Sequence, residues 1–504
     1  MKKIGPNNLL NVYILTVAGL VFSYMSLPMY TQGIYEQCLI IPVMLFWGSL
    51  KERGADHQCG KWWIFSGTMA AWFLLLQFRR EIINDGVNDI GLFLSTYLFA
   101  FPLASLCRDG DKKKALKIFA GAYLAAAAVL SAEGLLLALD CLPAFLTQYI
   151  YWDGARAYIS WHPNIGACLL MIGIVFCTTF WAQAKTIRSQ ICYGLVCVLM
   201  IAAMALTSCR TAIILTGAYL AAQVFFAIVK HGKRWFVPGV VVFAVLTVVF
   251  YLGSMGVYRA NENAMIKKYT EQYAAQLAAE ESDPAVYDEE YSFEETAEPD
   301  NVPEGSEPKE YFEEEPYDDQ GEDIPIATDP YTGEVYLITD SVQSSIEADF
   351  GTLNSRTYIW SAALFAIRET PSILYWGMFN PGEYVSYYNF FPAGHLHNAW
   401  LQCLVGMGVV GFALAMLFTL TTIWNCLVIL VKHHRDSWKR NVALLALCIL
   451  VASVLEPYLF YTTVAYHLVD FLFFLCAGYL LHWQEADNQY IISWIRSKVS
   501  LSKK

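Results

Sequence analysis

Long apolar segments recur along most of this 504-residue chain, separated by short polar stretches. A bilayer core of about 30 Å needs about 20 mostly apolar residues per helix, and most of these segments approach that length. No strand-length alternation accompanies them, and only helices could satisfy their backbone groups in lipid. The pattern predicts an all-α polytopic membrane helix bundle of about twelve transmembrane helices, at 8–27, 33–50, 62–78, 88–107, 115–139, 163–183, 190–206, 209–229, 235–254, 397–430, 441–460 and 463–483.

Composition agrees with a membrane protein. Apolar residues make up 56% of the chain and charged residues 15%, against roughly 45–50% and 25% in soluble domains. The first apolar stretch lacks a small-residue cleavage site, so it is interpreted as a retained helix. The segment 397–430 is longer than one span requires, which favours a tilted or partly extramembranous helix.

The distribution of Lys and Arg predicts the orientation, because these residues accumulate in cytoplasmic loops. Segments on one side of the twelve-span arrangement hold 23 of the 33 basic residues, whereas short loops on the other side hold four. Both termini are therefore expected to lie in the cytoplasm. The basic segments are the N-terminus, 51–61, 108–117, 185–188, 230–234, 432–440 and the C-terminus.

A long polar stretch interrupts the apolar pattern and predicts an extracytoplasmic loop. Its middle part, 271–349, is rich in Asp and Glu and contains a single lysine, so it is expected to be disordered. An arm that binds calcium or a cationic polymer is the less favoured alternative, and no EF-hand spacing occurs. An interfacial helix is expected at 354–370, ended by Pro371. The predicted organisation is 1–254 (helices one to nine), 255–396 (loop), 397–484 (helices ten to twelve) and 485–504 (cytoplasmic tail).

Three residues at predicted outward helix starts are the main candidates for chemistry: Arg210, Arg356 and His397. A helix N-terminus disfavours a cation but attracts an anion, so arginine beside one predicts a phosphate clamp. The same dipole favours a neutral His397 imidazole, which can accept a proton near pH 7. The alternatives are arginines that extend to lipid phosphates and a histidine that only caps its helix.

Weaker candidates surround these three. Glu456 and the pair His467 and Asp470 lie at or inside predicted spans, and the pair is interpreted as structural. No metal site is expected on the outer side, and no cofactor, since phosphate-cradling loops are missing and the only Asp-x-Asp, 109–111, lies in a cytoplasmic loop. The candidates for substrate binding are Arg156, Asn164, Asn398, Arg368 and His395.

Three passages resemble the O-antigen ligase and polymerase superfamily. They are Trp161-His-Pro-Asn164-Ile-Gly, Ser208-Cys-Arg210-Thr-Ala, and a block from Ser355-Arg356 through Pro371 and Gly377 to His397-Asn-Ala-Trp-Leu-Gln402 and Gly406-Met-Gly-Val-Val-Gly411. The turn around Gly377 is looser than the family's glycine-rich version, and the acidic insert is unusual.

The resemblance implies a metal-independent membrane glycosyltransferase in cell-surface polysaccharide biosynthesis. Its donor would be a polyprenyl-diphosphate-linked glycan, bound through Arg210 and Arg356, and its acceptor a glycan, lipid or protein hydroxyl activated by His397. Nucleic acid is not an expected partner. One alternative is a flippase or transporter of lipid-linked oligosaccharide, although no internal repeat supports it. The other is a sensor with an acidic arm, which would leave the clustered Arg and His unexplained.

Overall fold

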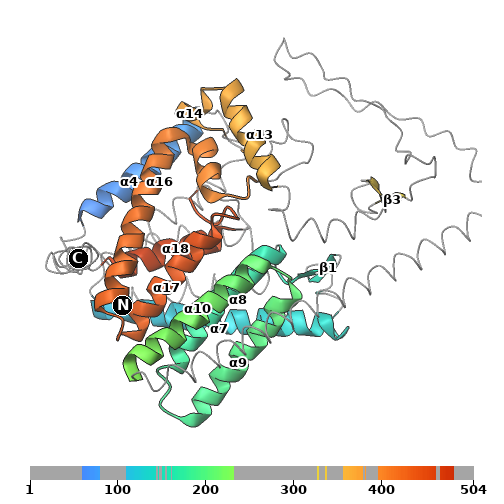
Figure 1. The fold of residues 1–504 in the computed structure, drawn as a ribbon, viewed down its shortest axis with the longest axis vertical. Coiled ribbons are helices and arrows are strands. Elements are labelled where there is room, and N and C mark those ends of the chain that lie inside the picture. Colours follow the sequence, from blue (N-terminus) through green and yellow to red (C-terminus); the bar gives the residue numbers. More distant parts are fainter. Residues whose placement is uncertain are drawn as a thin grey trace, which may run out of the picture. The chain divides into compact units, whose positions relative to one another are not determined.

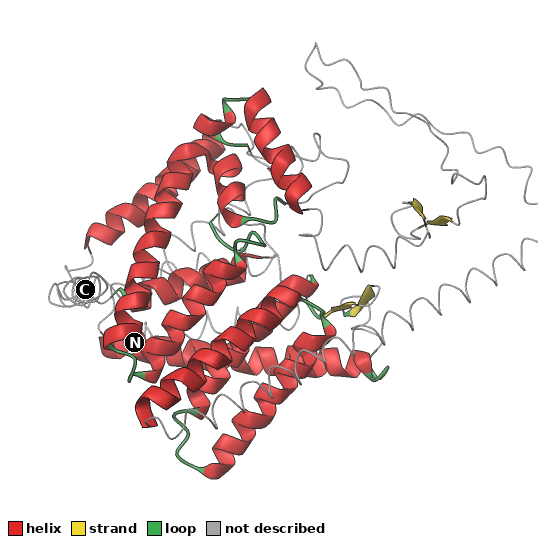
Figure 2. Cartoon of the chain, in the orientation of Figure 1, coloured by secondary structure: helices red, strands yellow, loops and turns green. Residues whose placement is uncertain are grey.

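In the computed structural model the described part of the chain is mostly helical, and short loops join several of the helices (Figure 2). The structure describes residues 60–79, 109–143, 146, 150–153, 156–160, 162–231, 326–328, 335–337, 356–378, 381, 395–460 and 466–481. The helices are α4 (Gly60–Arg79), α7 (Asp109–Ala138), α8 (Pro163–Trp181), α9 (Ile187–Leu206), α10 (Arg210–His231), α13 (Arg356–Glu369), α14 (Ile373–Trp376), α16 (Ala399–Lys432), α17 (Ser437–Ala452) and α18 (His467–Leu480), as labelled in Figure 1.

The chain divides into two compact units. The first comprises Met1–Ile266 and Ile359–Lys504, and the second comprises Lys267–Tyr358. Helix α13 starts in the second unit and continues in the first. The described core belongs to the first unit, which holds every described helix except the first residues of α13.

Helix α8 lies at the centre of the first unit. It packs against α7, α9, α10 and α17, and nearly all its residues are buried. The sequence explains this position, because α8 is apolar on every side and a helix of that kind buries all its faces. Pro163 occupies its first turn, where the missing N–H costs nothing. Residues at the N-terminus of α8 are therefore held at the middle of one end of the bundle.

Five helices of the described part are long and apolar enough to cross a membrane. Four coincide with predicted spans: Leu116–Ala138, Pro163–Trp181, Ile187–Leu206 and Arg210–Val229. The fifth is α16, and α4, α17 and α18 also form helices where spans were predicted. The predicted spans 8–27, 33–50, 88–107 and 235–254 lie outside the described residues. Helix α17 ends at Ala452 rather than near 460, because a turn with Pro457 follows.

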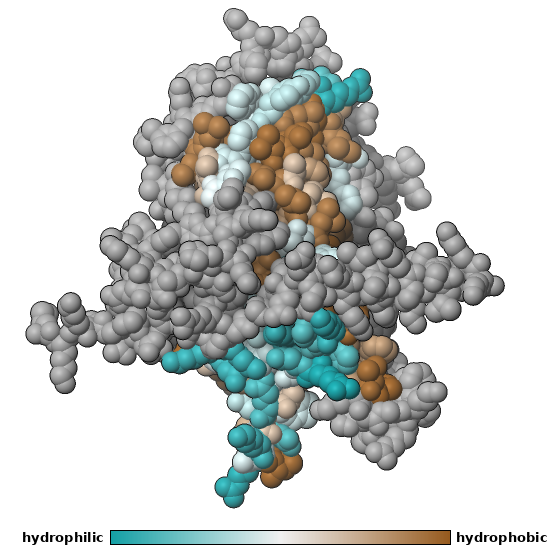
Figure 3. All heavy atoms as spheres, turned by 90° about the vertical axis from the view of Figure 1, so that its left-hand side faces the viewer, coloured by the Kyte–Doolittle hydropathy of each residue, from teal (hydrophilic) through white to brown (hydrophobic). Residues whose placement is uncertain are grey.

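Apolar side chains on the outside of the bundle support a membrane environment. Ile187, Ile191 and Leu195 are exposed on α9 at four-residue spacing, so they form one face of that helix. Helix α10 exposes Ile214, and α16 exposes Leu417. Such stripes would be unfavourable in water. The view in Figure 3 shows hydrophobic side chains over much of the upper described surface and hydrophilic side chains gathered near the lower end.

Loops that were predicted to be cytoplasmic gather at one end of the bundle. Gln183, after α8, donates to Ser437 at the start of α17 over 3.3 Å. Lys113, at the start of α7, lies 3.9 Å from Asp436. Arg440 donates to Gln223 near the end of α10 at 2.9 Å. The basic segments 108–117, 185–188 and 432–440 thus share one end, as the charge pattern predicted, and the N-terminus of α8 lies at the other.

Helix α16 is interrupted at Gly408, which has φ 68°. A Cβ there would lie 2.8 Å from the carbonyl oxygens of Leu374 and Tyr375, so only glycine fits. Trp72 of α4 donates to the Met407 carbonyl at 2.9 Å, which satisfies a group beside the break. The overlong segment 397–430 is therefore a helix bent beside α14, as the ribbon in Figure 1 shows.

Two short pairs of strands, which the sequence did not predict, accompany the helices. Strands β1 (Tyr151–Asp153) and β2 (Arg156–Tyr158) form an antiparallel hairpin in which Tyr151 pairs with Tyr158. Strands β3 (Ile326–Thr328) and β4 (Val335–Leu337) form a second one inside the acidic segment expected to be disordered. The strands of both pairs are three residues long, too short for hydrophobic alternation to reveal them.

Candidate functional site

The end of the bundle opposite the basic loops holds an unusual set of backbone conformations. Four non-glycine residues of the described chain have positive φ: Asp140, Ser208, His397 and Phe460. They follow α7, separate α9 from α10, precede α16 and lie between α17 and α18, respectively. Left-handed backbone is uncommon for such residues and gathers at functional sites. This end of the bundle therefore has the backbone conformations of a functional site.

A polar chain begins at Arg156 of the β1–β2 hairpin. Its guanidinium donates to Asn164 Oδ1 at 2.5 Å and to the carbonyl of Thr207 at 3.2 Å. Asn164 occupies the first turn of α8, so its side chain is fixed by the central helix. Thr207 belongs to the turn that joins α9 to α10. Arg156 thus connects the hairpin, the start of α8 and the turn before α10.

The carboxylate of Glu456 lies at the centre of the site. Its residue is 1% exposed, and a carboxylate this deeply buried needs partners. Asn164 Nδ2 donates to Oε1 at 2.7 Å, and the Tyr466 hydroxyl donates to Oε2 at 3.3 Å. His397 Nδ1 lies 3.3 Å from the same Oε2. Glu456 therefore joins residues from α8, the segment before α16 and the start of α18.

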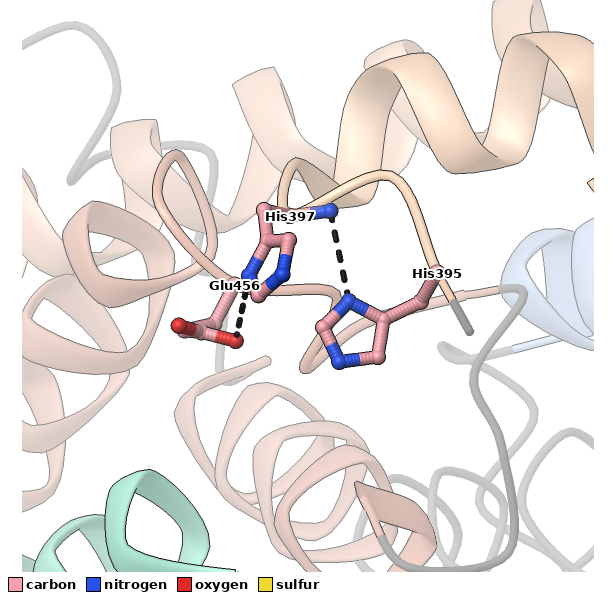
Figure 4. Close-up of side chains that lie close together, drawn as sticks. All are labelled: His395, His397 and Glu456. Carbon is pink, nitrogen blue, oxygen red and sulfur yellow. Dashed lines mark hydrogen bonds and ion pairs between the residues drawn. The ribbon is translucent and has the colours of Figure 1, made fainter. Parts of the chain in front are cut away.

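Two histidines face this carboxylate, as Figure 4 shows for His395, His397 and Glu456. Their rings are 4.1 Å apart and steeply inclined. The His397 backbone N–H donates to His395 Nδ1 at 3.4 Å, so a neutral His395 carries its proton on Nε2. Nε2 lies 2.9 Å from the Tyr466 hydroxyl, which donates onward to Glu456. The tautomer of His395 follows from these two contacts.

Asn398 positions the histidines through the backbone. It is the N-cap of α16, and its side chain accepts from the N–H groups of Trp400 and Leu401. Its Nδ2 donates to the Val454 carbonyl at 3.0 Å, so the cap also connects α16 to the turn after α17. Gln402 Oε1 accepts from the Leu396 N–H at 2.9 Å. The pattern His397-Asn-x-x-x-Gln402 is thus explained as a capped helix start that fixes the preceding loop.

Arg210 is the first residue of α10, as predicted, and its side chain is exposed. It lies three residues after Thr207, whose carbonyl accepts from Arg156. The Arg156 contact therefore fixes the turn that carries Arg210. A helix of 22 residues begins at this position, and its free N–H groups favour an anion there.

Arg356 is the first residue of α13, which confirms a helix start at this arginine. Further along α13, Trp360 donates to the Leu396 carbonyl at 3.0 Å. Ile359, Ala363 and Leu396 belong to one small buried cluster. The helix that Arg356 opens is thus attached to the loop that carries His395 and His397.

Arg368 is not among the residues gathered around Glu456. It lies in the last turn of α13 with a side chain 81% exposed, and its Nε is 3.9 Å from Glu369. An exposed pair at this distance contributes little to stability. Among the predicted site residues, five come together around Glu456: Arg156, Asn164, His395, His397 and Asn398. Arg210 lies three residues after Thr207, the residue whose carbonyl accepts from Arg156.

His162 lies next to the site, although the sequence analysis did not name it as a candidate. It is the N-cap of α8, and its Nδ1 accepts from the Asn164 N–H at 3.2 Å. Burial, and then the positive charge of Arg156, lower the pKa of His162 from 6.5 to about 4. A neutral ring at physiological pH keeps its Nδ1 lone pair for the cap. His162 therefore acts here as a fixed acceptor.

The sequence places Glu456 among the weaker candidates, and it singles out neither Tyr458 nor Tyr466. Tyr458 donates to the Asn164 carbonyl at 2.9 Å. All three lie in or beside the turn between α17 and α18, where aromatic residues are common in any interfacial segment. The sequence feature that could have indicated these residues is Glu456, since a carboxylate at the end of a transmembrane span needs a polar partner.

A group of possible metal ligands also lies at this end of the bundle, where the sequence predicts no metal site. His395, His397 and Glu456 each offer one ligand atom, and these atoms lie within 4.8 Å of one another. Two imidazoles and a carboxylate form a donor set that suits a divalent transition metal. Sequence spacing did not reveal this set, because Glu456 is distant in the chain from the histidines.

The fold and the exposed apolar helices define an integral membrane protein with a polar site at one end of its bundle. Residues 195–416 match the protein-family model described as O-antigen ligase. The match supports membership of the O-antigen ligase superfamily, as the motifs around Arg210, Arg356 and His397 predicted. Arg156, Asn164 and Glu456 lie outside the matched range. No curated protein and no solved structure matches the chain.

Proposed function

We propose that the chain transfers or polymerises a polyprenyl-diphosphate-linked glycan onto an acceptor hydroxyl at the outer face of the cytoplasmic membrane. The family suggests an O-antigen ligase or polymerase type of activity. The observation that carries the proposal is the convergence of Arg156, Asn164 and Glu456 on His397. Arg210 begins a helix beside this network, within the range matched to the family.

In the proposed reaction the acceptor oxygen attacks the anomeric carbon of the donor sugar. The new C–O bond forms as the bond to the diphosphate breaks, with inversion, and polyprenyl diphosphate leaves with the electron pair. His397 Nε2 accepts the proton of the hydroxyl. The negative charge of Glu456, 3.3 Å from His397 Nδ1, favours the tautomer with its proton on Nδ1, so the lone pair on Nε2 stays available. The step requires no metal ion.

Arg210 and Arg356 are proposed to bind the diphosphate. Guanidinium groups bind phosphate oxygens bidentately, and both arginines begin helices whose N–H groups favour an anion. Holding donor and acceptor in line while stabilising the departing charge would supply most of the rate enhancement. Asn398 fixes the loop, and Arg156 and Asn164 fix Glu456. His395 and Arg368 are proposed as flanking contacts for the glycan.

The test uses the purified full chain with a synthetic lipid-diphosphate glycan and candidate acceptors. Arg210→Ala and Arg356→Ala are each expected to reduce the rate of glycan transfer about 100-fold or more, because each removes a group that stabilises the leaving charge. Arg188→Ala is the matched control, since Arg188 lies in the first turn of α9 at the other end of the bundle. It is expected to keep the wild-type rate.

Each outcome distinguishes the alternatives. Growth of the glycan indicates a polymerase, and transfer to a different acceptor indicates a ligase. Movement of the intact donor across liposomes without bond change would replace the proposal with a flippase. Wild-type transfer rates in either arginine variant, with normal expression and membrane insertion, would contradict the proposed diphosphate contacts.

A further inference from the structure

His397 Nδ1 lies in an unusual position for a hydrogen-bonded histidine. The atom is buried and 3.3 Å from Glu456 Oε2, yet it makes no hydrogen bond within the described part of the chain. The separation therefore suits a hydrogen bond but the alignment does not. Two ligand atoms bound to one zinc ion at about 2.0–2.2 Å lie roughly 3.3 Å apart and point at the metal rather than at each other. His397 Nδ1 and Glu456 Oε2 have this separation.

His395 supplies a third donor with suitable support. Its Nε2 proton is directed to the Tyr466 hydroxyl, and its Nδ1 lone pair points toward His397, where it accepts the backbone N–H over 3.4 Å, a long contact that a metal ion would replace. Metal-binding histidines almost always donate their other ring N–H to an oxygen, which fixes the tautomer and the ring orientation. On the carboxylate, Asn164 binds Oε1 and leaves Oε2 facing the histidines. Both supporting contacts are already present.

We infer that His395, His397 and Glu456 form a binding site for a divalent transition metal, with Zn²⁺ as the best fit. Two imidazoles and one carboxylate match zinc's preferred donors and leave a fourth position for water. The ligand atoms lie within 4.8 Å of one another, so a small closure of the His395 ring completes the site.

The site has a consequence for transfer, which rests on the proposed function. Zinc on His397 Nδ1 requires that a neutral ring carries its proton on Nε2. The ring then has no lone pair for the acceptor hydroxyl. Zinc is therefore an inhibitor of transfer, and the metal-free protein is the active form.

The binding test titrates EDTA-treated, purified full-length protein with Zn²⁺ by calorimetry and with Co²⁺ by visible absorption. Wild type is expected to bind one equivalent, and the cobalt spectrum should lack thiolate charge-transfer bands, which separates this site from the cysteines. His395→Ala and Glu456→Gln should each weaken zinc binding 10-fold or more. His434→Ala is the matched control, because His434 follows α16 at the other end of the bundle.

Two results of the binding test would contradict the metal site. Absence of a bound equivalent in wild type, or unchanged binding in both His395→Ala and Glu456→Gln, shows that the cluster is only a hydrogen-bonded network. His395→Asn provides a variant with a smaller change of volume if alanine prevents folding. If zinc binds through the three ligands and the rate of transfer does not fall, the metal site is confirmed. The same result would contradict the proposal that His397 is the general base.

Discussion

Asn164 shows how one side chain holds the site together. It accepts from Arg156 and donates to Glu456, and its carbonyl accepts from Tyr458. An amide is suited to this position because it offers an acceptor and a donor from a single rigid group. A carboxylate here would repel Glu456, and an apolar side chain would leave two charged groups without their partner.

Asn164→Ala is expected to destabilise the protein by about 1–3 kcal/mol, because Glu456 Oε1 and Arg156 lose a buried partner. Transfer per folded molecule should fall about 10- to 100-fold as His397 loses its fixed neighbour. Thermal unfolding in detergent gives the first quantity, and a glycan-transfer assay gives the second.

Asn441→Ala is the matched control for that variant. Asn441 is equally buried on α17, where it donates to Thr179 and accepts from Gln223 at the other end of α8. Its loss should cost similar stability and leave transfer per folded molecule unchanged. Equal loss of transfer in both variants would show that Asn164 acts only through stability.

At the scale of elements, α14 packs beside the break in α16, a contact that the sequence alone does not predict. Gly377 ends α14 with φ 64°, and a Cβ there would overlap the Gly406 carbonyl. Met378 N–H donates to the Val405 carbonyl at 2.6 Å. The turn after α13 is therefore packed directly on the first part of α16, which carries the histidine loop at its start.

Gly408→Ala is expected to destabilise the protein by about 1–3 kcal/mol, because alanine is strained at φ 68° and meets two carbonyl oxygens. Gly217→Ala is the matched control, because Gly217 lies inside α10 and a Cβ added there would have no atom within 4 Å. It should be neutral or stabilising by up to about 1 kcal/mol. Thermal unfolding midpoints compare them, and equal stability in both variants would argue that α16 straightens without cost.

At the scale of the whole molecule, the second unit raises the question of what the acidic insert contributes. His395, His397, Glu456 and their described partners belong to the first unit, whereas Lys267–Tyr358 holds the acidic segment, the β3–β4 hairpin and Arg356. The two short strands have no described hydrophobic core of their own. A segment of this composition gains little from folding by itself.

Deletion of residues 275–345 is therefore expected to leave the helical bundle folded and the rate of transfer close to that of wild type. Size-exclusion chromatography and the transfer assay check these outcomes. The deletion keeps the N-terminal flank of α13, so Arg356 stays in its helix. Loss of transfer from a folded deletion variant would assign the acidic segment a role in acceptor recognition.

The length and apolarity of the segments by themselves determined the helical class and the positions of the described spans. This was possible because a bilayer forces each span to satisfy its own backbone, so length and apolarity are sufficient evidence. The starts of α10, α13 and α16 were likewise predictable at Arg210, Arg356 and Asn398, since caps and breakers are local signals. The charge of the loops also predicted which of them share an end.

Only the tertiary structure decided which side chains meet at the site. Glu456 reaches His397 and Asn164 from distant parts of the chain, and no local pattern encodes such a contact. The break at Gly408 depends on α14 packing beside it, and the tautomer of His395 depends on Tyr466. The residue types were visible in the sequence, but their chemistry is a property of neighbours that helix packing brings together.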